Sequence, residues 1–448
     1  MHKVIMRLIS DNILEEVRQA TPTYPAIYPE IGGFNLGKPT EFVKGQPFDH
    51  FKKMREQAPI SWTPLPRKTR GFWSVTRYED VKKVALSPEI YSSEYGGISI
   101  AQPPKYLQFP RKLVPAVINS LINLDAPRHM ELRIQQKDFF IPKFVKTLTE
   151  NVSRKIDELL DNLEAEANKT GEVDFVRHFS EQLPLYTLCE MLGIDEEDRP
   201  RIIRWMNYLE MAPQVATAPW QTFKNDPKFI MRYVKNVNQM FRYGQRIMEE
   251  RRLKPRKDLL SAIATSTLEG EFLPQEFLDG SWLLIIFAGN DTTRNSLGGV
   301  MRLLTQFPEQ KKIVLEDPSL IPKMLQESMR MTSPVMRMRR TVVQETELSG
   351  QRLARDEKVV LWYGAANRDP DIFSNPDEFN ILRENASKHI AFGHGPHKCL
   401  GSRVANLQLR LAYEKILDRF PDIHWTGEQT IAGNNFVHSI MSLKVRLN

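Results

Sequence analysis

The sequence has very little cysteine: only Cys189 and Cys399 occur in 448 residues, and they lie far apart. A secreted, disulfide-stapled fold needs several closely spaced cysteines, so no disulfide is expected and a reducing compartment is favoured. Cys189 lies on an apolar helical pattern and is expected in the core. Long apolar runs are missing too. The longest, residues 282–288, is far too short to cross a bilayer. The N-terminus is broken by charges, unlike a secretory signal. These absences predict a soluble, cytoplasmic protein with no membrane span.

A strong charge of one sign is also lacking. The formal net charge is +7, from 62 basic and 55 acidic residues. The basic residues are scattered, with no stripe interleaved with aromatics, so nucleic acid is not an expected partner. Apolar residues make up 41% and charged residues 26%, which is typical of globular proteins. No linker or low-complexity segment divides the chain, so we expect one domain over residues 1–448.

The chain has a mainly α pattern with a smaller β-rich part. The expected parts are an N-terminal arm (1–50), a helical core (124–333) and a β segment, meander and loop (334–403), with strands at 340–348, 358–363 and 436–447. Residues 98–120 are rich in proline and are expected to form an irregular loop of the kind that often carries function. Helix breaks are expected near prolines and glycines, at 142, 171, 184, 193, 213 and 255.

One helix stands out by its length. Pro274 is expected to begin it, and Pro308 to end it after Phe307, because proline fits the start of a helix and ends one that precedes it. At 1.5 Å per residue this helix would be about 50 Å long, enough to cross the whole domain.

Cys399 lies in the run AFGHGPHKCLGSR, residues 391–403, just before a helical pattern. Glycine and proline there predict a tight loop whose backbone can approach a flat object closely. The loop would deliver the sulfur at a helix N-terminus, where free N–H groups and the helix dipole favour a thiolate. Three interpretations remain: a buried structural cysteine, a haem iron with an axial thiolate, or a zinc site formed with His389, His394 and His397.

Phe392, Gly395, Cys399 and Gly401 fit the pattern Phe-x-x-Gly-x-x-x-Cys-x-Gly. This run resembles the haem-binding loop of the cytochrome P-450 superfamily. The resemblance implies the cytochrome P-450 fold, with haem b between the long central helix and the loop that carries the cysteine. It further implies that Cys399 is the iron ligand and that Phe392 and Gly401 belong to the haem-binding set.

The long helix carries Ala288-Gly289-Asn290-Asp291-Thr292-Thr293. Leu284, Ala288 and Thr292 share one face at spacings of four, and small residues there would let a planar group lie against the backbone. An ordinary kinked core helix is the alternative. The stretch is similar to the oxygen-activating segment of the superfamily. That similarity implies that Ala288 and Gly289 contact the haem and that Asp291 and Thr292 are catalytic, managing protons.

Glu327 and Arg330 can pair at i, i+3 on one helix face, which alone is a weak signal. Their position resembles the Glu-x-x-Arg of the superfamily, a buried structural pair behind the haem. The third partner, an arginine in a Pro-x-Arg-Phe segment, is absent from residues 376–379. Arg368 and Arg383 both remain candidates for that place. The resemblance also implies a set of side chains for the haem propionates: His129, Arg133, Arg340 and His397.

Several longer strings, such as residues 289–296 and 435–437, resemble the soluble bacterial alkane hydroxylases of the superfamily. That branch hydroxylates the terminal carbon of medium-chain alkanes and related acids, alcohols and monoterpenes. Ala288 departs from it, because the branch usually has glycine there. The positions of the family's substrate pocket are all apolar in this chain: Ile98, Ile100, Leu284, Val335, Met336, Met338, Phe436 and Val437.

The expected activity is therefore that of a haem-thiolate monooxygenase, which inserts one atom of O2 into an unactivated C–H bond of a small apolar substrate. Few residues follow Cys399 and no flavin or iron–sulfur motif is present. Electrons are thus expected from a ferredoxin and its ferredoxin reductase. Two alternatives stay open: oxidation of terpenes or sterols, and a non-catalytic haem-thiolate binding or sensor protein. A peroxide-driven enzyme is disfavoured because the chain has both Asp291 and Thr292, a pair that peroxide chemistry does not require.

Overall fold

The computed structural model describes residues 30–65, 70–100, 113–210 and 227–448. The chain divides into two compact units. Unit 1 comprises residues 1–101, 326–399 and 431–439, and unit 2 comprises residues 102–325, 400–430 and 440–448. Helices predominate and strands are fewer, so the mainly α class with a smaller β part is confirmed. The single domain over residues 1–448 stays a prediction.

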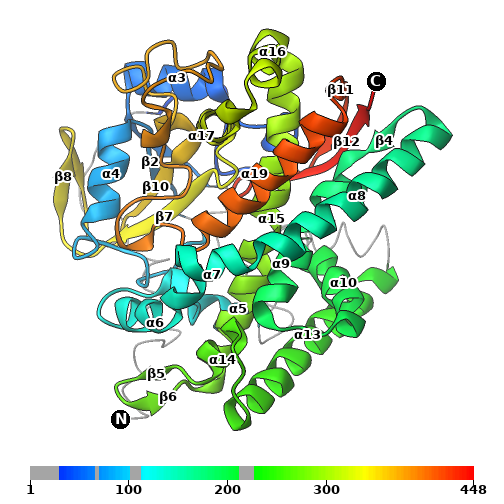
Figure 1. Cartoon of the computed structure of the whole chain (residues 1–448). Helices are drawn as coiled ribbons and strands as arrows, with labels where there is room; N and C mark the ends of the chain where they lie inside the picture. Colours follow the sequence, from blue (N-terminus) through cyan, green and yellow to red (C-terminus); the bar gives the residue numbers. More distant parts are fainter. Residues whose placement is uncertain (1–29, 66–69, 101–112, 211–226) are drawn as a thin grey trace. The chain divides into compact units, whose positions relative to one another are not determined.

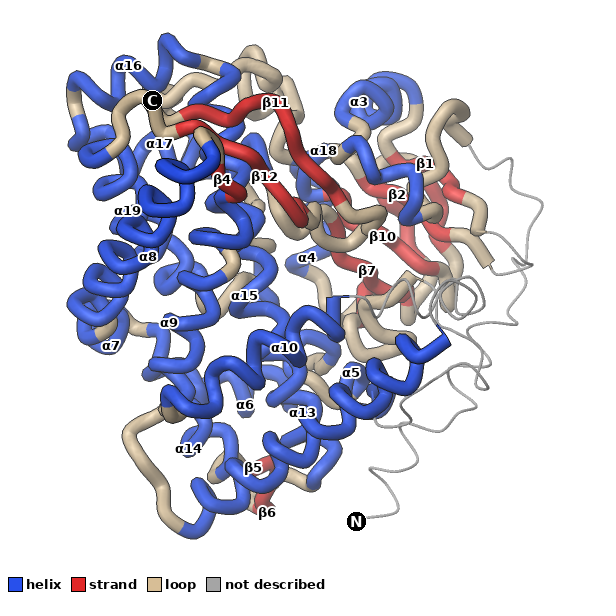
Figure 2. Tube along the Cα trace, turned by 90° about the vertical axis from the view of Figure 1, so that its right-hand side faces the viewer, coloured by secondary structure: helices blue, strands red, loops and turns tan. Residues whose placement is uncertain are grey.

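Unit 1 contains a five-stranded sheet, visible in Figures 1 and 2. Its order is β1 (Ile60–Thr63), β2 (Phe72–Val75), β10 (Lys358–Trp362), β7 (Arg337–Val342), β3 (Tyr91–Ser92). The β2–β10 pair is parallel and the other pairs are antiparallel. The remaining elements of unit 1 are α3 (Phe48–Gln57), α4 (Tyr78–Leu86), β8 (Thr346–Leu348), β9 (Gln351–Leu353), α18 (Tyr363–Ala366) and the 3-10 turns η1 (Pro39–Lys44), η8 (Ala386–Lys388) and η9 (Gly395–His397).

The central strand β10 is buried along its whole length, because both faces of the sheet are covered. Side chains alternate between the two faces of a strand. Val359 and Leu361 accordingly lie in one apolar cluster with Trp73, while Val360 and Trp362 lie in a second cluster. The alternation of β10 thus builds two separate hydrophobic cores, one on each side of the sheet.

Unit 2 is built mainly of helices around α15 (Gln275–Gln306), which packs against α5, α9 and α13. Its other helices are α5 (Leu113–Ile118), α6 (Arg128–Gln136), α7 (Pro142–Thr147), α8 (Thr149–Thr170), α9 (Gln182–Leu192), α10 (Arg199–Glu210), α13 (Pro227–Leu253), α14 (Leu259–Ala264), α16 (Pro308–Glu316) and α19 (Ser402–Arg419). Helix α17 (Ile321–Thr332) crosses the division between the units.

Short elements complete unit 2. They are β5 (Thr267–Leu268) paired with β6 (Glu271–Phe272), a sheet in the order β11 (His424–Ile431), β12 (Ile440–Arg446), β4 (Val173–Asp174), the π-helical turn η5 (Val176–Ser180), and the 3-10 turns η3 (Leu121–Asn123), η4 (Lys137–Phe140), η6 (Glu196–Asp198) and η7 (Pro318–Leu320). Figure 2 shows α19 beside α8, a pairing that the contacts between the two helices support.

The long helix is confirmed with the expected ends. Pro274 caps α15 in an extended conformation and Phe307 ends it before Pro308. Its 32 residues span about 48 Å. A β-carbon at Gly280 would lie 2.6 Å from the carbonyl oxygen of Ala116, so glycine at this position lets α5 approach the backbone of α15 closely. The glycine therefore fixes how closely the two helices pack.

Some sequence predictions were wrong. Pro184 does not break a helix; it occupies the first turn of α9, where a missing N–H costs no hydrogen bond. Residues 113–118, expected within an irregular loop, form α5. The strand expected over 340–348 is two strands, β7 and β8, and of the segment 436–447 only β12 is a strand. The expected break at Pro213 and the loop at 101–112 lie outside the described residues, as do residues 1–29 of the N-terminal arm.

No helix within the described part of the chain is both long enough and apolar enough to cross a membrane.

Candidate active site

The loop that carries Cys399 is tightly closed in unit 1. The N–H of Cys399 donates to the carbonyl of Phe392 at 2.8 Å, and the N–H of Gly393 donates to that of Ile390 at 2.9 Å. Gly393 and Gly395 have φ of +74° and +68°, which L side chains rarely adopt. A β-carbon at Gly395 would lie 2.5 Å from the carbonyl oxygen of Ala85, so glycine there lets the loop press onto α4. The loop holds the Cys399 side chain in an exposed position.

The other cysteine has the opposite environment. Cys189 is fully buried in α9, as predicted for a core residue. Burial raises the pKa of its thiol to about 12 and outweighs the opposing charge of Arg199. Cys189 is therefore a neutral core thiol, which leaves Cys399 as the accessible cysteine sulfur.

The zinc alternative is not supported by the geometry. His389, His394, His397 and Cys399 form no group that could hold a metal ion. His389 is half-buried, and the loss of water around its ring, with Lys398 and Arg330 nearby, lowers its pKa to about 4. Its Nδ1 accepts the N–H of Ala391 at 3.2 Å. His389 thus stays neutral and supports the loop from inside.

Two of the predicted propionate partners belong to unit 1. The ring Nε2 of His397 lies 3.2 Å from the hydroxyl of Ser93. Arg340, on β7, is buried, and its Nη1 donates to the carbonyl of Arg339 at 2.8 Å. The loop and the strand that follows α17 thus supply a cysteine sulfur, an imidazole and a guanidinium from one unit.

The pair Glu327–Arg330 is buried, and the structure identifies a third partner. Arg330 donates from Nε and Nη2 to the two carboxylate oxygens, both at 2.7 Å, and each side chain is 0% exposed. Arg383 donates to the same carboxylate at 2.9 Å. Arg368, the other candidate, pairs with Asp377 at 2.7 Å. The open choice between Arg368 and Arg383 is thus settled by geometry in favour of Arg383.

Burial alone would raise the pKa of Glu327. The hydrogen bonds and charges of Arg330 and Arg383, with the N–H of Asn380, outweigh burial and hold the pKa below its usual value. Glu327 is therefore ionised in the folded protein. The guanidinium of Arg330 is further fixed by the carbonyls of Asn367, Pro376 and Glu378 at 2.7–3.0 Å. Glu327, Arg330 and Arg383 thus form a charged cluster that holds α17 to the chain segment of residues 367–383.

In unit 2, one face of α15 is open at the middle of an otherwise buried helix. Ala288 is exposed, and Leu284 and Thr292, four residues before and after it, are half-buried. The Thr292 hydroxyl donates to the Ala288 carbonyl at 2.9 Å. This open face is therefore apolar apart from the Thr292 hydroxyl. Its smallest side chain is the methyl group of Ala288.

Gly289 also has a packing role within unit 2, and its contact with the haem stays a prediction. A β-carbon there would lie 3.2 Å from Leu188 of α9, so the missing side chain allows α9 to pack against α15. Glycine in a helix costs about 1 kcal/mol relative to alanine. The packing of Leu188 supplies a structural reason for that cost.

Asp291 and Thr292 do not share a face. Asp291 is 2% exposed, and its carboxylate accepts from Arg294 at 2.5 Å and from Asn295 at 2.9 Å. Asn295 in turn accepts the N–H of Ile440 at 2.6 Å. Thr292 looks onto the open face, whereas Asp291 belongs to a buried polar network that joins α15 to β12.

Three more of the predicted haem-binding residues lie in unit 2. His129 and Arg133 occupy α6 at i, i+4, with His129 buried and Arg133 half-buried. Gly401 caps the N-terminus of α19, where a β-carbon would lie 3.9 Å from the ring of Phe140. A substitution at Gly401 therefore meets ordinary van der Waals contact rather than a clash.

The predicted substrate residues of unit 1 divide into two sets. Val335, Met338 and Phe436 keep some exposure, whereas the other four are buried: Ile98, Ile100, Met336 and Val437. Met336 packs in the apolar cluster on one face of the sheet, and its N–H donates to the carbonyl of Phe436 at 2.8 Å. Val335 and Val437 form a β-bridge. Met336 thus has the environment of a core residue.

Sequence reasoning missed Arg337 and Arg339, which alternate with Met338 and Arg340 along β7. Both are buried, and burial lowers the pKa of each to about 9. Arg339 donates to the carbonyls of Gly96 and Ser99 at 2.6 and 2.7 Å. Arg337 donates to the side chain of Asn435 at 3.2 Å. The available signal in the sequence was the presence of arginine at both 337 and 339 in a segment expected to be β-rich. In the structure these arginines anchor the segment that carries Ile98.

The residues present fit a haem. A cysteine sulfur on a glycine loop is a suitable ligand for haem iron. The imidazole and the guanidinium in the same unit are suitable donors for the haem carboxylates. The open face at Ala288 offers a flat, apolar surface without a charged side chain. The fold and the site together define a haem-thiolate protein.

The comparisons agree with this class. The family model for cytochrome P450 matches residues 97–430, so the chain belongs to the cytochrome P450 family. The expected fold is confirmed, the cofactor of this family is haem b, and the protein is an oxygen-inserting oxidoreductase, a P450 monooxygenase.

Relatives with several different names are similar over most of their length. The methyl-branched lipid omega-hydroxylase of Mycobacterium tuberculosis is 33% identical, over 88% of this chain and 90% of the relative. The steroid C26-monooxygenase of Rhodococcus jostii is 29% identical, over 96% and 87%. The structure of Mycobacterium marinum cytochrome P450 CYP268A2 in complex with pseudoionone is 30% identical, covers 94% of this chain and 100% of that one, and has a TM-score of 0.82.

Proposed function

We propose that this P450 hydroxylates the terminal carbon of medium-chain alkanes or fatty acids. The observation that carries the proposal is the open face of α15, where Leu284, Ala288 and Thr292 lie in line and none is charged. An apolar chain can lie along such a face without desolvating a charge. Similarity to a methyl-branched lipid omega-hydroxylase supports oxidation at the end of a chain.

Haem b would be held by the residues that the sequence predicts for it. We infer Cys399 as the iron ligand and Ala288, Gly289, Phe392 and Gly401 as contacts of the macrocycle. Four side chains supply cations or N–H donors, which suit its carboxylates: His129, Arg133, Arg340 and His397. When bound, the haem supplies the activation of dioxygen, by which one oxygen atom enters a C–H bond and the other leaves as water.

Terminal selectivity requires a narrow channel. A methyl C–H bond is stronger than those of the methylenes beside it, so intrinsic reactivity favours attack inside the chain. Positioning must therefore outweigh reactivity by presenting only the methyl group. Leu284 on α15 and the half-exposed Val335, Met338 and Phe436 are the side chains we assign to the channel wall.

Binding and product analysis across a substrate series tests the proposal. Each additional buried CH2 contributes about 0.8 kcal/mol, so affinity for linear chains should rise about fourfold per carbon until the channel is full. The main product should be the primary alcohol. A preference for a sterol, or products oxidised only inside the chain, would contradict terminal hydroxylation while leaving the P450 assignment intact.

Terpenes or sterols are a second candidate substrate class, favoured by the similarity to a steroid C26-monooxygenase and to the structure with bound pseudoionone. Including one sterol and one monoterpene in the same series separates the two classes. A non-catalytic haem binder or sensor would give no product with any electron donor.

The Thr292 hydroxyl is assigned to proton handling on the open face. It donates to the Ala288 carbonyl, a bond it can exchange for one to water. The Asp291 carboxylate would have to leave Arg294 before it could exchange protons with that water. Asp291 therefore acts, in this proposal, only when its ion pair opens.

Thr292→Ala is expected to uncouple reductant use from hydroxylation, because the open face loses its hydroxyl. Product per reductant consumed should fall at least about tenfold while hydrogen peroxide rises. The matched control is Thr293→Ala, since Thr293 is the buried neighbour on the same helix. If the Thr292 and Thr293 variants form the same amount of product per reductant consumed, Thr292 has no special role in proton handling.

A ferredoxin, reduced by its reductase, is the proposed electron donor. Lys137, Lys143, Lys146 and Arg403 are all exposed in unit 2. They come from η4, α7 and the start of α19, elements that contact one another; Arg403 donates to the carbonyl of Phe140 at 3.4 Å. This basic surface of unit 2 would attract a small acidic protein. Lys398, exposed beside Cys399 in unit 1, is a separate candidate contact.

Lys143→Glu with Lys146→Glu is expected to slow the first electron transfer by about tenfold or more at low salt and to weaken its salt dependence. Substrate affinity should not change. Lys254→Glu with Lys257→Glu is the control, because these exposed lysines have the same i, i+3 spacing. Stopped-flow reduction at several salt concentrations measures the rate. Equal slowing in both double variants would place docking elsewhere.

A further inference from the structure

Helices α10 and α13 lie side by side in unit 2 (Figures 1 and 2) and leave a groove of about 440 Å³. Four arginines line it: Arg201 and Arg204 from α10, and Arg242 and Arg246 from α13. All four are exposed. None of the residues assigned to haem, proton handling or substrate contributes to this groove.

The floor of the groove is aromatic and rigid. Trp205 and Tyr243 are buried, with ring centroids 5.4 Å apart, and Trp282 of α15 packs behind Tyr243 at 5.9 Å. The Trp282 indole N–H donates to the carbonyl of Met240 at 3.1 Å. A β-carbon at Gly244 would lie 2.6 Å from the Trp282 ring, so this glycine allows the close packing. The arginines therefore stand on a fixed platform.

Within the described residues, the positive charge of the groove has few close acidic partners. Asp198 accepts from Arg201 and from the Tyr243 hydroxyl, both at 2.9 Å. Glu250 lies 3.9 Å from Arg246, and both side chains are more than half exposed, so that pair is weak. Among the residues that the structure describes, neither Arg204 nor Arg242 forms an ion pair. Asp198 is thus the one acid closely engaged by a groove arginine in the described chain.

This arrangement is unfavourable without an anion. Arg201 and Arg204 are spaced i, i+3 and Arg242 and Arg246 i, i+4, and like charges at these spacings repel each other on one helix face. Packing the two helices together adds repulsion between the pairs. An oxyanion in the groove would convert this repulsion into charge-assisted hydrogen bonds.

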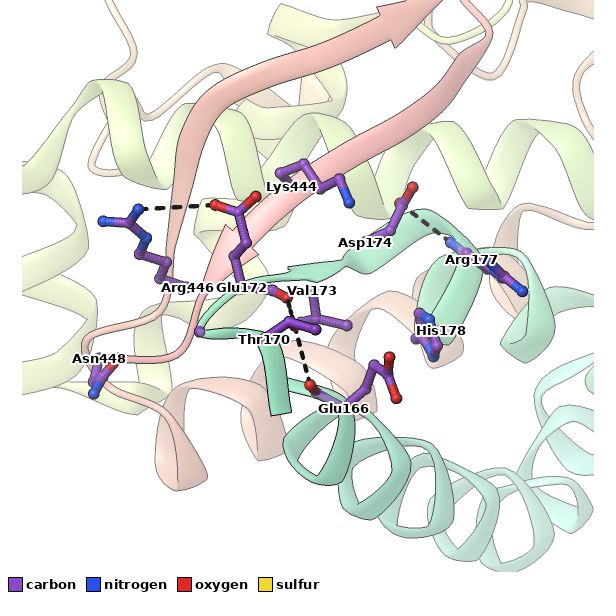
Figure 3. A pocket seen from close by; sticks show the side chains of 11 residues that line it. Glu166, Thr170, Glu172, Val173, Asp174, Arg177, His178, Lys444, Arg446 and Asn448 are labelled. Carbon is purple, nitrogen blue, oxygen red and sulfur yellow. Dashed lines mark hydrogen bonds and ion pairs between the residues drawn. The ribbon is translucent and has the colours of Figure 1, made fainter. Parts of the chain in front are cut away.

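A larger surface hollow of unit 2 provides a contrast (Figure 3). It has a volume of about 880 Å³ and is bounded by the end of α8, β4, η5 and β12. Both acidic and basic side chains line it, among them Glu172 and Arg446, which lie 3.8 Å apart. Its charges are balanced within the protein, unlike those of the arginine groove.

We propose that the arginine groove binds a compound with two adjacent phosphate groups. Each guanidinium can hold a phosphate through two parallel N–H···O bonds, and two arginines on each wall match two phosphates. The concave shape and the fixed floor suit a small group better than a broad protein surface. The phosphates come either from a free diphosphate compound or from phosphate headgroups at a lipid surface. This inference is independent of the proposed substrate.

Calorimetric titration of the holoenzyme with inorganic pyrophosphate tests the groove directly. Arg204→Gln with Arg242→Gln should weaken binding by about tenfold or more. The affinity of Arg204→Lys with Arg242→Lys should lie between those of wild type and the glutamine variant. Lysine keeps the positive charge but cannot form two parallel N–H···O bonds to one phosphate. The control, Arg154→Gln with Arg355→Gln, removes the same charge from two exposed arginines outside the groove and should change affinity by no more than about twofold.

A parallel arm separates the two sources of phosphate. Sedimentation with phosphatidylcholine vesicles, with and without phosphatidic acid, is measured for the same variants. Groove-dependent binding of pyrophosphate assigns a free diphosphate ligand; groove-dependent binding of the phosphatidic acid vesicles alone assigns headgroups. If the groove variant and the control bind both probes equally, the proposal is overturned. Because all substituted arginines are exposed, both double variants should unfold at the wild-type temperature without ligand.

Discussion

Glu327→Ala is expected to lower the free energy of unfolding by about 3–5 kcal/mol. The substitution removes the carboxylate that pairs with Arg330, whose side chain is 0% exposed. The guanidinium would keep its bonds to the carbonyls of Asn367 and Pro376, but its charge would be buried without a counter-ion. Arg383 would lose the same partner. The loss of stability comes mainly from leaving the charge of Arg330 buried without a counter-ion.

A matched pair in the same unit separates burial from charge. Glu345 also pairs with an arginine, Arg352, but the two side chains are 51% and 59% exposed. Glu345→Ala should therefore cost no more than about 1 kcal/mol. Urea unfolding followed by circular dichroism measures both variants. Similar losses for Glu327→Ala and Glu345→Ala would show that the buried cluster does not hold the fold.

The cluster also has a pH signature. Because the pKa of Glu327 is lower in the folded protein than its ordinary value of 4.5, the cluster contributes stability above that value. The contribution is lost as the pH falls through the folded pKa, where the carboxylate takes up a proton. Wild-type stability should therefore fall more steeply below pH 4.5 than that of Glu327→Gln.

The parts of the structure that depend on local sequence could be predicted. Pro274 and Pro308 mark the ends of α15, because proline acts on its own neighbourhood. The loop of Cys399 could be recognised from glycine and cysteine spacing alone. The core position of Cys189 followed from the apolar helical pattern around it.

The parts that depend on distant residues could not. The partner of Glu327 is Arg383 rather than Arg368 because the path of the loop after Pro376 decides which guanidinium arrives. The sheet β11–β12–β4 joins strands more than 200 residues apart. Neighbouring residues of a helix point in different directions, but the sequence did not indicate that the Asp291 carboxylate would be bound by Arg294 and Asn295.

Cys399→Ser is expected to abolish thiolate ligation completely. Of the two sulfur atoms from cysteine in the chain, only that of Cys399 is exposed. Serine is nearly the same size and fits the loop closed by the bond from residue 399 to Phe392, but its hydroxyl is a hard ligand that stays protonated. The fold should be retained, so the loss would report on the ligand and not on unfolding.

Cys189→Ser is the matched control. Its thiol is buried and neutral, with a pKa of about 12, and cannot take the place of Cys399. The substitution buries a hydroxyl in an apolar core, so a modest loss of stability, about 1–3 kcal/mol, is expected. Haem ligation should be the same as in the wild type.

The visible spectrum of the reduced protein with carbon monoxide tests the account most directly. Wild type and Cys189→Ser should show the red-shifted band peculiar to thiolate-ligated haem, and Cys399→Ser should lack it. A thiolate spectrum that persists in Cys399→Ser, or is lost in Cys189→Ser, would contradict the assignment of Cys399 as the iron ligand.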